Sequence, residues 1–119
     1  MYVDGYLLPV KTARKAEYLD LCRTAAQVFL DHGATRVVET WADDVKSGEH
    51  TSFPQAVKLE DDETCVFSWI EFPDRATRDA CMAKVMEDER MDTSFDAMPV
   101  DGARMIFGGF EPLIDERAG

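Results

Sequence analysis

The sequence is poor in cysteine, in basic residues and in long apolar runs. Its 3 cysteines, an odd number with no Cys-x-x-Cys spacing, exclude a disulfide framework and indicate the reduced thiols of a cytoplasmic protein. Its 13 Lys and Arg against 24 Asp and Glu give a net charge of −11, which argues against nucleic-acid and anionic-membrane partners. No run approaches the ~18–20 apolar residues of a membrane helix. The N-terminus also lacks the basic cluster of a signal peptide, so a cytoplasmic location is expected.

Motifs of the common catalytic and metal-binding classes are absent as well. There is no glycine-rich phosphate loop, no HExxH zinc motif and no GxSxG nucleophile elbow. His32 and His50 do not stand at finger-like spacing from the cysteines, and the acidic runs lack the spacing of a calcium loop. His50 and Ser52 are close in sequence, but nothing orients them as base and nucleophile. We therefore expect neither a metal site nor a cofactor.

The residues that are present indicate one domain of strands and helices. With 119 residues, 45% of them hydrophobic, the chain can bury one core, so residues 1–119 are expected to form a single domain. The expected strands are 2–10, 35–42, 65–72 and 103–110, and the expected helices are 12–32 and 74–89. Thr12 and Asp74 are the expected N-caps, and Gly33 is the expected left-handed C-cap of the first helix. The Gly108–Gly109 pair indicates a bulge or a close backbone approach.

This βαββαβ order predicts an α+β, ferredoxin-like fold, a four-stranded antiparallel sheet with two helices on one face. The uncovered face should be polar in a monomer. In the third strand, however, Phe67 and Trp69 alternate with Ile70 and Phe72, so both faces are apolar. A large exposed apolar patch marks an interaction site. We therefore expect a homodimer through the open sheet face, arranged as a dimeric α+β barrel.

A long excursion at 43–64 separates the second and third strands. Hairpin loops usually have ~2–5 residues, and this one contains apolar residues such as Phe53 and Leu59 that must dock against something. Two interpretations stay open. The excursion is either an arm that completes the dimer or a lid over a ligand cavity, with His50 and Phe53 at the lip.

One set of sheet residues suggests a site for a small molecule. The expected ligand-binding residues are Tyr6, Glu39, Trp41, Trp69 and Arg104. A carboxyl group beside aromatic rings can have a raised pKa and act as a base, which makes Glu39 the candidate catalytic residue. Arg104 is expected to neutralise Glu39 or Glu71. A pocket with an unpaired Glu39 favours an enzyme, whereas a filled interface with Glu39 tied to Arg104 favours a structural role.

Several segments resemble the YbaA-like family, small bacterial proteins grouped as a domain of unknown function. The resemblance is carried by Tyr2–Tyr6, Val38–Val45, Val66–Pro73, Met91, Met98–Gly102 and Arg104–Glu111. It covers nearly the whole chain and implies the dimeric α+β barrel superfamily, which includes cofactor-free monooxygenases, haem-dependent enzymes, isomerases and plain binding modules. It brings no catalytic residue with it, because none is established for the family.

Whether the protein is an enzyme is therefore left open. The expected function is that of a homodimer that binds or transforms a small organic molecule, like a cofactor-free monooxygenase or an isomerase. The alternative is a non-catalytic binding or interaction module whose sheet residues serve dimerisation.

Overall fold

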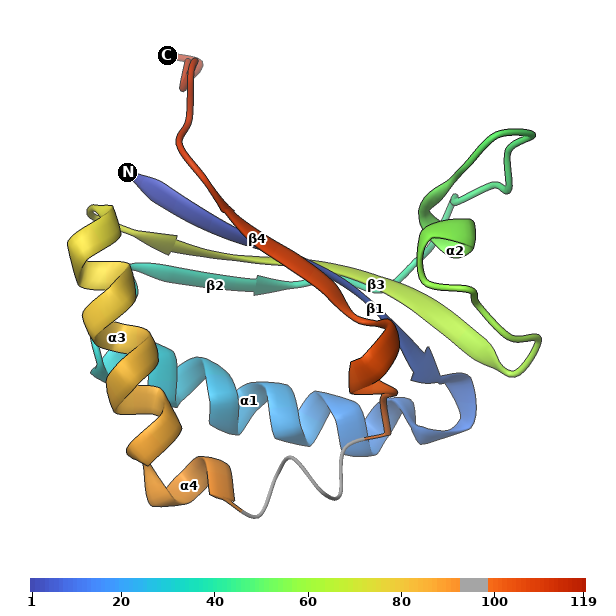
Figure 1. Ribbon diagram of the computed structural model, residues 1–119, viewed down its shortest axis with the longest axis horizontal. Coiled ribbons are helices and arrows are strands. Elements are labelled where there is room, and N and C mark those ends of the chain that lie inside the picture. The colour runs from blue at the N-terminus through green and yellow to red at the C-terminus, as the bar shows by residue number, and fades with distance from the viewer. Residues whose placement is uncertain (93–98) are drawn as a thin grey trace.

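The computed structural model describes residues 1–92 and 99–119 of the chain. The elements are β1 Tyr2–Lys11, α1 Lys15–Asp31, β2 Arg36–Glu39, α2 Phe53–Ala56, β3 Glu63–Phe72, α3 Arg75–Glu87, α4 Glu89–Asp92 and β4 Ile106–Phe110 (Figure 1). Short 3-10 turns occupy Thr12–Arg14 and Gly102–Arg104. Of the stretch 92–100, which the sequence predicts to be irregular or a short helical turn, residues 93–98 lie outside the described residues.

The four strands form one antiparallel sheet in the order β2-β3-β1-β4. In this order the two long strands β1 and β3 lie at the centre, and β2 and β4 form the edges. Helices α1 and α3 cover one face, and the excursion between β2 and β3 lies on the other face (Figure 1). The predicted α+β, ferredoxin-like topology is confirmed.

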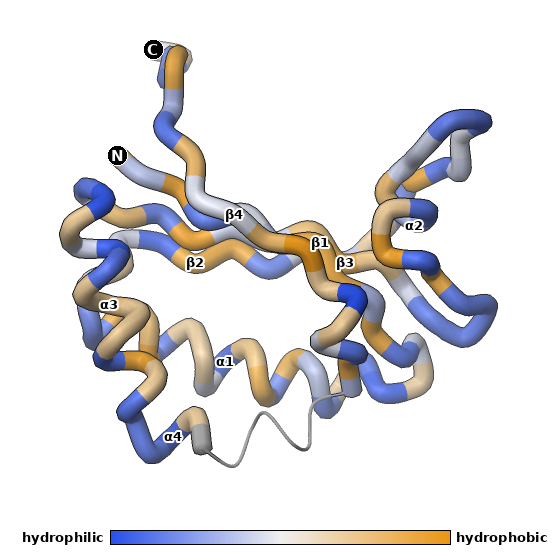
Figure 2. Tube along the Cα trace, viewed as in Figure 1, coloured by the Kyte–Doolittle hydropathy of each residue, from blue (hydrophilic) through white to orange (hydrophobic). Residues whose placement is uncertain are grey.

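The main core lies between the sheet and the two helices. Phe72 and Val66 of β3 are fully buried there, together with Val28 of α1 and Cys81 of α3. Alternate residues of a strand point to opposite faces, so the residues between these, such as Phe67, point to the open face. Figure 2 shows apolar residues along the central strands and polar residues on the outer sides of the helices.

Helix α3 begins as the sequence predicts, and α1 does not. The Asp74 side chain accepts a hydrogen bond of 2.7 Å from the backbone N–H of Thr77. Thr12 caps nothing, because its hydroxyl is hydrogen-bonded to that of Thr64 at 2.7 Å and holds this residue beside β3. A 3-10 turn therefore precedes α1, which starts at Lys15. The helix ends before Gly33, whose φ of 125° confirms the predicted left-handed cap.

The two edge strands are shorter than expected. β2 ends at Glu39 rather than at residue 42, because the Thr40 hydroxyl takes the place of a backbone donor and bonds the Phe67 carbonyl. β4 starts at Ile106 rather than at residue 103, because Asp101 accepts a hydrogen bond from the Ala103 N–H and holds the preceding residues in a 3-10 turn. Gly108 and Gly109 stay in regular register with β1, so there is a close approach but no bulge.

The excursion docks on the open face of its own sheet. Val57 is 1% exposed and packs against Leu7 of β1 and Cys65 of β3, with Leu59 beside them. Helix α2 within it begins at Ser52, whose hydroxyl oxygen accepts a hydrogen bond from the Gln55 N–H. The excursion is thus ordered by apolar burial at one end of the sheet. Across the described residues, none of the helices has the length and apolar character needed to cross a membrane.

Candidate functional site

The register separates the expected site residues onto the two faces of the sheet. Tyr6 stands opposite Ser68 on β3, and Glu39 of β2 stands opposite the same residue from the other side. Tyr6 and Glu39 therefore face the helices together. Trp41, just beyond β2, packs against the same helix-side core. Trp69 is paired with Gly5 and Val38 and points to the open face, so the prediction that all of these aromatic residues converge is wrong.

The Glu39 carboxyl group is held by neutral donors. Its Oε2 atom accepts a hydrogen bond of 2.9 Å from the hydroxyl of Tyr18 on α1, and Ser68 and Cys22 also donate to it. The residue as a whole is exposed along the β2 edge, but its carboxyl is closely surrounded by protein atoms. This burial raises the pKa of Glu39 above its ordinary value, against the lowering effect of the three donors. No ion pair joins Glu39 to any cation of residues 1–92 and 99–119.

The Tyr6 hydroxyl is a second polar group on the helix side of the sheet, and it lies two strands away from Glu39. Adjacent strands are ~4.8 Å apart, so the Cα atoms of Tyr6 and Glu39 are separated by about 10 Å, with Ser68 between them. Burial is the main reason that the pKa of Tyr6 is raised, and the carboxylates of Asp4 and Glu39 add to it. Tyr6 therefore stays protonated at neutral pH. Within the described part of the chain its hydroxyl has no hydrogen-bond partner, and its ring stacks on Phe107.

A second buried carboxyl group lies further along β1. Asp4 is 3% exposed, and its Oδ1 atom accepts a hydrogen bond of 3.2 Å from Arg78 of α3. The same guanidinium donates to the Tyr2 hydroxyl at 3.1 Å and lies over the Tyr2 ring, 4.9 Å from its centroid. Oδ2 of Asp4 has no hydrogen-bond partner among residues 1–92 and 99–119. Burial raises the pKa of Asp4, and the nearby Arg78 opposes that shift.

Arg104 belongs to neither of these groups. Its guanidinium donates to both carboxylate oxygens of Glu63, at 2.7 and 2.6 Å, and to the carboxylate of Asp101 at 2.9 Å. It also donates to the backbone carbonyl of Lys58. The prediction that Arg104 neutralises Glu39 or Glu71 is wrong, because the 3-10 turn before β4 places this side chain beside the end of the excursion. Arg104 therefore ties β4 to the start of β3.

The salt bridge expected near the aromatic residues is formed by Glu71. Its Oε2 atom accepts a hydrogen bond of 2.9 Å from the Trp69 indole N–H and lies 3.5 Å from Arg36 of β2. This group sits on the open face, beside Phe67, whose ring is 5.9 Å from that of Trp69. Of the two acids singled out from the sequence, Glu71 is thus paired with a cation and Glu39 is not.

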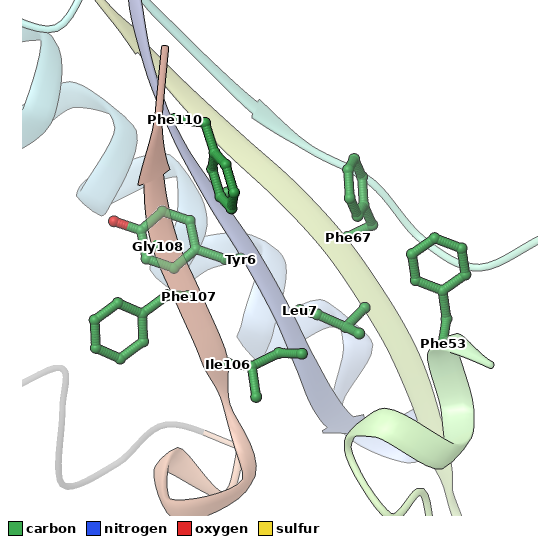
Figure 3. A pocket seen from close by; sticks show the side chains of 9 residues that line it. Tyr6, Leu7, Phe53, Phe67, Ile106, Phe107, Gly108 and Phe110 are labelled. Carbon is green, nitrogen blue, oxygen red and sulfur yellow. The ribbon is translucent and has the colours of Figure 1, made fainter. Parts of the chain in front are cut away.

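Two apolar hollows occupy the open face. One of about 290 Å³ lies between β4 and the excursion and is lined by Leu7, Phe53, Phe67, Ile106 and Phe110, among others (Figure 3). The other, about 250 Å³, lies on the far side of Phe53 and includes Trp41 and Val45. Phe53 stands between them with its ring edge-on to Phe67, 5.8 Å away. The predicted lip residue Phe53 thus lines both hollows, and His50 lines neither.

The remaining reactive groups are held in structural roles. Cys65 and Cys81 are buried and Cys22 is half-buried, and burial raises the pKa of each thiol, that of Cys22 to about 12. They behave as small apolar residues. Glu60, Asp62 and Glu63 place carboxylate oxygens within 4.8 Å of one another. Lys11 and Arg104 bind these same carboxylates, so two protein cations already offset most of the charge of the cluster.

Sequence reasoning missed the residues that surround Glu39. Tyr18 and Cys22 are one turn apart on the predicted buried side of the first helix. Their spacing therefore identifies them only as core residues. Ser68 interrupts an otherwise apolar strand face, and this was the available signal. A lone serine on a buried strand face usually has a polar partner on a neighbouring element.

Comparison with known proteins adds a family and a fold. A family model described as a protein of unknown function (DUF1428) matches residues 1–102. The uncharacterised protein YbaA of Escherichia coli strain K12 is 49% identical over 115 residues, covering 97% of this chain and 98% of that protein. YbaA of Shigella flexneri matches with the same identity and coverage.

Solved structures with similar folds have little sequence identity. An uncharacterised NIPSNAP domain protein from Burkholderia xenovorans has a TM-score of 0.59 at 12% identity. The match covers 98% of this chain and 100% of that protein. A dimeric ferredoxin-like protein from an uncultured marine organism has a TM-score of 0.58 at 7% identity and covers 99% of this chain and 100% of its own. These similarities show a shared fold.

Proposed function

The chain belongs to the DUF1428 family of proteins of unknown function, and within it we propose that this protein binds a small organic molecule and uses Glu39 as a general base. The observation that carries the proposal is the environment of the Glu39 carboxyl, which has three neutral donors from two elements, α1 and β3, a raised pKa and no cation partner in the described chain. A raised carboxyl pKa brings a base closer to the working pH, where proton abstraction is most effective.

Tyr6 supplies the complementary group. Its protonated hydroxyl faces the same layer and is free to donate a hydrogen bond to a substrate oxygen. When Glu39 takes a proton from a carbon next to a carbonyl group, the electron pair of the broken C–H bond moves onto that oxygen. A positioned donor stabilises the negative charge that develops there. The β2 edge gives the substrate access, because Glu39 is exposed along it.

The test is deuterium exchange on carbonyl compounds. A panel of small ketones and 1,3-diketones in D₂O is followed by proton NMR with wild-type protein, with Glu39→Gln, and with Glu87→Gln, an exposed acid on α3, as the matched control. Wild type and the control should accelerate exchange of at least one compound, and Glu39→Gln should lose at least 100-fold of that acceleration. If Glu39→Gln accelerates exchange as well as wild type, Glu39 is not the base.

The proposal includes a cytoplasmic homodimer formed by the open sheet face. Phe67 of β3 and Phe110 of β4 remain 46% and 63% exposed on this face, next to the apolar hollows. One of the fold relatives is described as dimeric. Light scattering at micromolar concentration should give twice the 13.4 kDa of one chain, and Phe67→Ser should reduce it to the single mass. A wild-type mass of one chain would contradict the homodimer.

The second candidate is a non-catalytic interaction module, and the same exposed apolar face favours it. In this case the sheet contact is the whole function and Glu39 only bonds α1 to β2. Dimer formation without any exchange activity or small-molecule binding would favour this candidate over the enzyme.

A further inference from the structure

The C-terminal tail has two apolar side chains that are not buried against the rest of the protomer. After β4 ends at Phe110, the tail leaves the sheet on the open side (Figure 1). Leu113 is 99% exposed and Ile114 is 80% exposed. Burying a leucine or isoleucine side chain is strongly favourable, so two adjacent ones left in water point to a segment that docks elsewhere.

The excursion projects from the same face at the other end of the sheet. Figures 1 and 2 show the tail rising beside the N-terminal end of β1 and the excursion rising near the C-terminal end of that strand. Beside the excursion lies the hollow of about 290 Å³ whose walls include Phe53, Phe67 and Ile106 (Figure 3). These three side chains are each about half exposed, so the hollow is apolar and open.

A two-fold axis brings the two projections together. In an isologous dimer each surface element meets the element to which the axis relates it on the partner. An axis that lies between two stacked sheets and runs across the strands exchanges the two ends of the face. The tail of one protomer then lies alongside the excursion of its partner, and the reciprocal contact forms at the other end.

The amount of exposed apolar surface fits such a contact. Seven large apolar side chains are exposed on the open face, the excursion and the tail: Val45, Phe53, Phe67, Ile106, Phe110, Leu113 and Ile114. At ~200 Å² for a complete large side chain, they expose on the order of 800 Å², about what each partner contributes to a stable dimer. Without the two tail residues the exposed area is roughly 500 Å², below that standard.

We propose that Leu113 and Ile114 of each protomer dock into the partner's apolar hollow around Phe53 and Phe67. This contact rests on the proposed homodimer and specifies which segments of the two protomers meet in its interface. Both segments carry more acids than bases, so apolar burial rather than charge drives the docking. The occupant of the hollow is then a second copy of this chain, and the excursion acts as an arm of the dimer.

Disulfide cross-linking of the full-length chain tests the contact directly. Ile114→Cys and Phe53→Cys are placed in one chain, where the two sites lie at opposite ends of the sheet and are out of reach of each other. Oxidation should give a covalent dimer that reducing agent dissolves. The single Ile114→Cys variant and the pair Ala118→Cys with Phe53→Cys are the controls, and both should give far less covalent dimer.

A second measurement tests the same contact without cysteine variants, in case one of these does not fold. Leu113→Ser with Ile114→Ser should raise the dimer dissociation constant at least tenfold in sedimentation experiments, whereas the polar control Glu116→Ser with Arg117→Ser should leave it within twofold. A dimer that shows no cross-link and no change on Leu113→Ser with Ile114→Ser overturns tail docking but keeps the homodimer. A wild-type monomer overturns both. The role of Glu39 is judged separately by the exchange experiment.

Discussion

Arg104 and Glu63 form a bidentate ion pair, with N···O distances of 2.7 and 2.6 Å, which joins the 3-10 turn before β4 to the first residue of β3. The Glu63 side chain is only 2% exposed, and the guanidinium also reaches the backbone of the excursion. Bidentate pairs of this kind combine charge with fixed geometry. Removing one member leaves the other buried without its partner.

Arg104→Gln should therefore destabilise the protein by roughly 2–3 kcal/mol, since Lys11 at 3.6 Å compensates the Glu63 charge only in part. Arg23→Gln is the control, because Arg23 pairs with Asp20 on the exposed side of α1 and such a pair contributes ~0.5 kcal/mol or less. Urea unfolding monitored by circular dichroism gives both values. Equal losses for the two variants would show that the Glu63 pair is no more important than a surface contact.

The same pair makes stability sensitive to acid. The Arg104 hydrogen bonds, more than any other contact, lower the pKa of Glu63 from 4.5 to about 2 in the folded protein. A lowered folded-state pKa means that this stabilisation is fully present above the unfolded pKa and is lost as the pH falls through the folded value. Stability should fall between about pH 4.5 and pH 2. In Glu63→Gln, denaturant titrations across this window should show a shallower slope, and an unchanged slope would assign the acid loss to other carboxylates.

The Arg104 pair also shows what the sequence can and cannot predict. The order of strands along the chain, the two long helices and the apolar open face follow from periodicity, because each depends on local spacing. The partner of Arg104 depends on the 3-10 turn Gly102–Arg104, which moves the start of the last strand by three residues, from the predicted residue 103 to Ile106. A shift of that size decides whether the side chain reaches Glu39 or Glu63. Likewise the side on which Trp69 points relative to Glu39 depends on inter-strand register, which the sequence of one strand does not contain.

Two tyrosines on the helix side should respond differently to loss of the hydroxyl group. Tyr18 is buried and donates to Glu39 at 2.9 Å, whereas the Tyr6 hydroxyl has no partner within the described residues. Tyr18→Phe should reduce the free energy of unfolding by about 1 kcal/mol, and Tyr6→Phe should leave it within ~0.5 kcal/mol. Chemical denaturation measures both. A loss for Tyr6→Phe equal to that of Tyr18→Phe would mean that Tyr6 makes a structural hydrogen bond and is not free for a substrate.

Glu39 should make stability depend on pH in the direction opposite to Glu63. Its pKa is raised in the folded protein, chiefly by burial, so the folded state binds this proton more tightly than the unfolded chain. The stabilisation is fully present below the unfolded pKa and is lost as the pH rises through the folded value. Glu39→Gln removes this loss, so its stability relative to wild type should increase from pH 4 to pH 7, a range set by the ordinary carboxyl value of ~4.3. Urea unfolding of both proteins at pH 4 and at pH 7 measures this difference, and a difference that does not change with pH would contradict the prediction.

Gly109 should be the least replaceable glycine of β4. A Cβ atom at this position would overlap the hydroxyl and ring of Tyr2, whereas one at Gly102 would meet no atom within 4 Å. Tyr2 has little room to move, because Arg78 lies over its ring and bonds its hydroxyl while also binding Asp4. Gly109→Ala should therefore cost roughly 1–3 kcal/mol through overpacking, and Gly102→Ala should change stability by less than ~0.5 kcal/mol. Thermal and urea unfolding compare the two variants. If both are equally stable, Tyr2 moves aside at no cost, and the Asp4–Arg78–Tyr2 group is looser than its hydrogen bonds indicate.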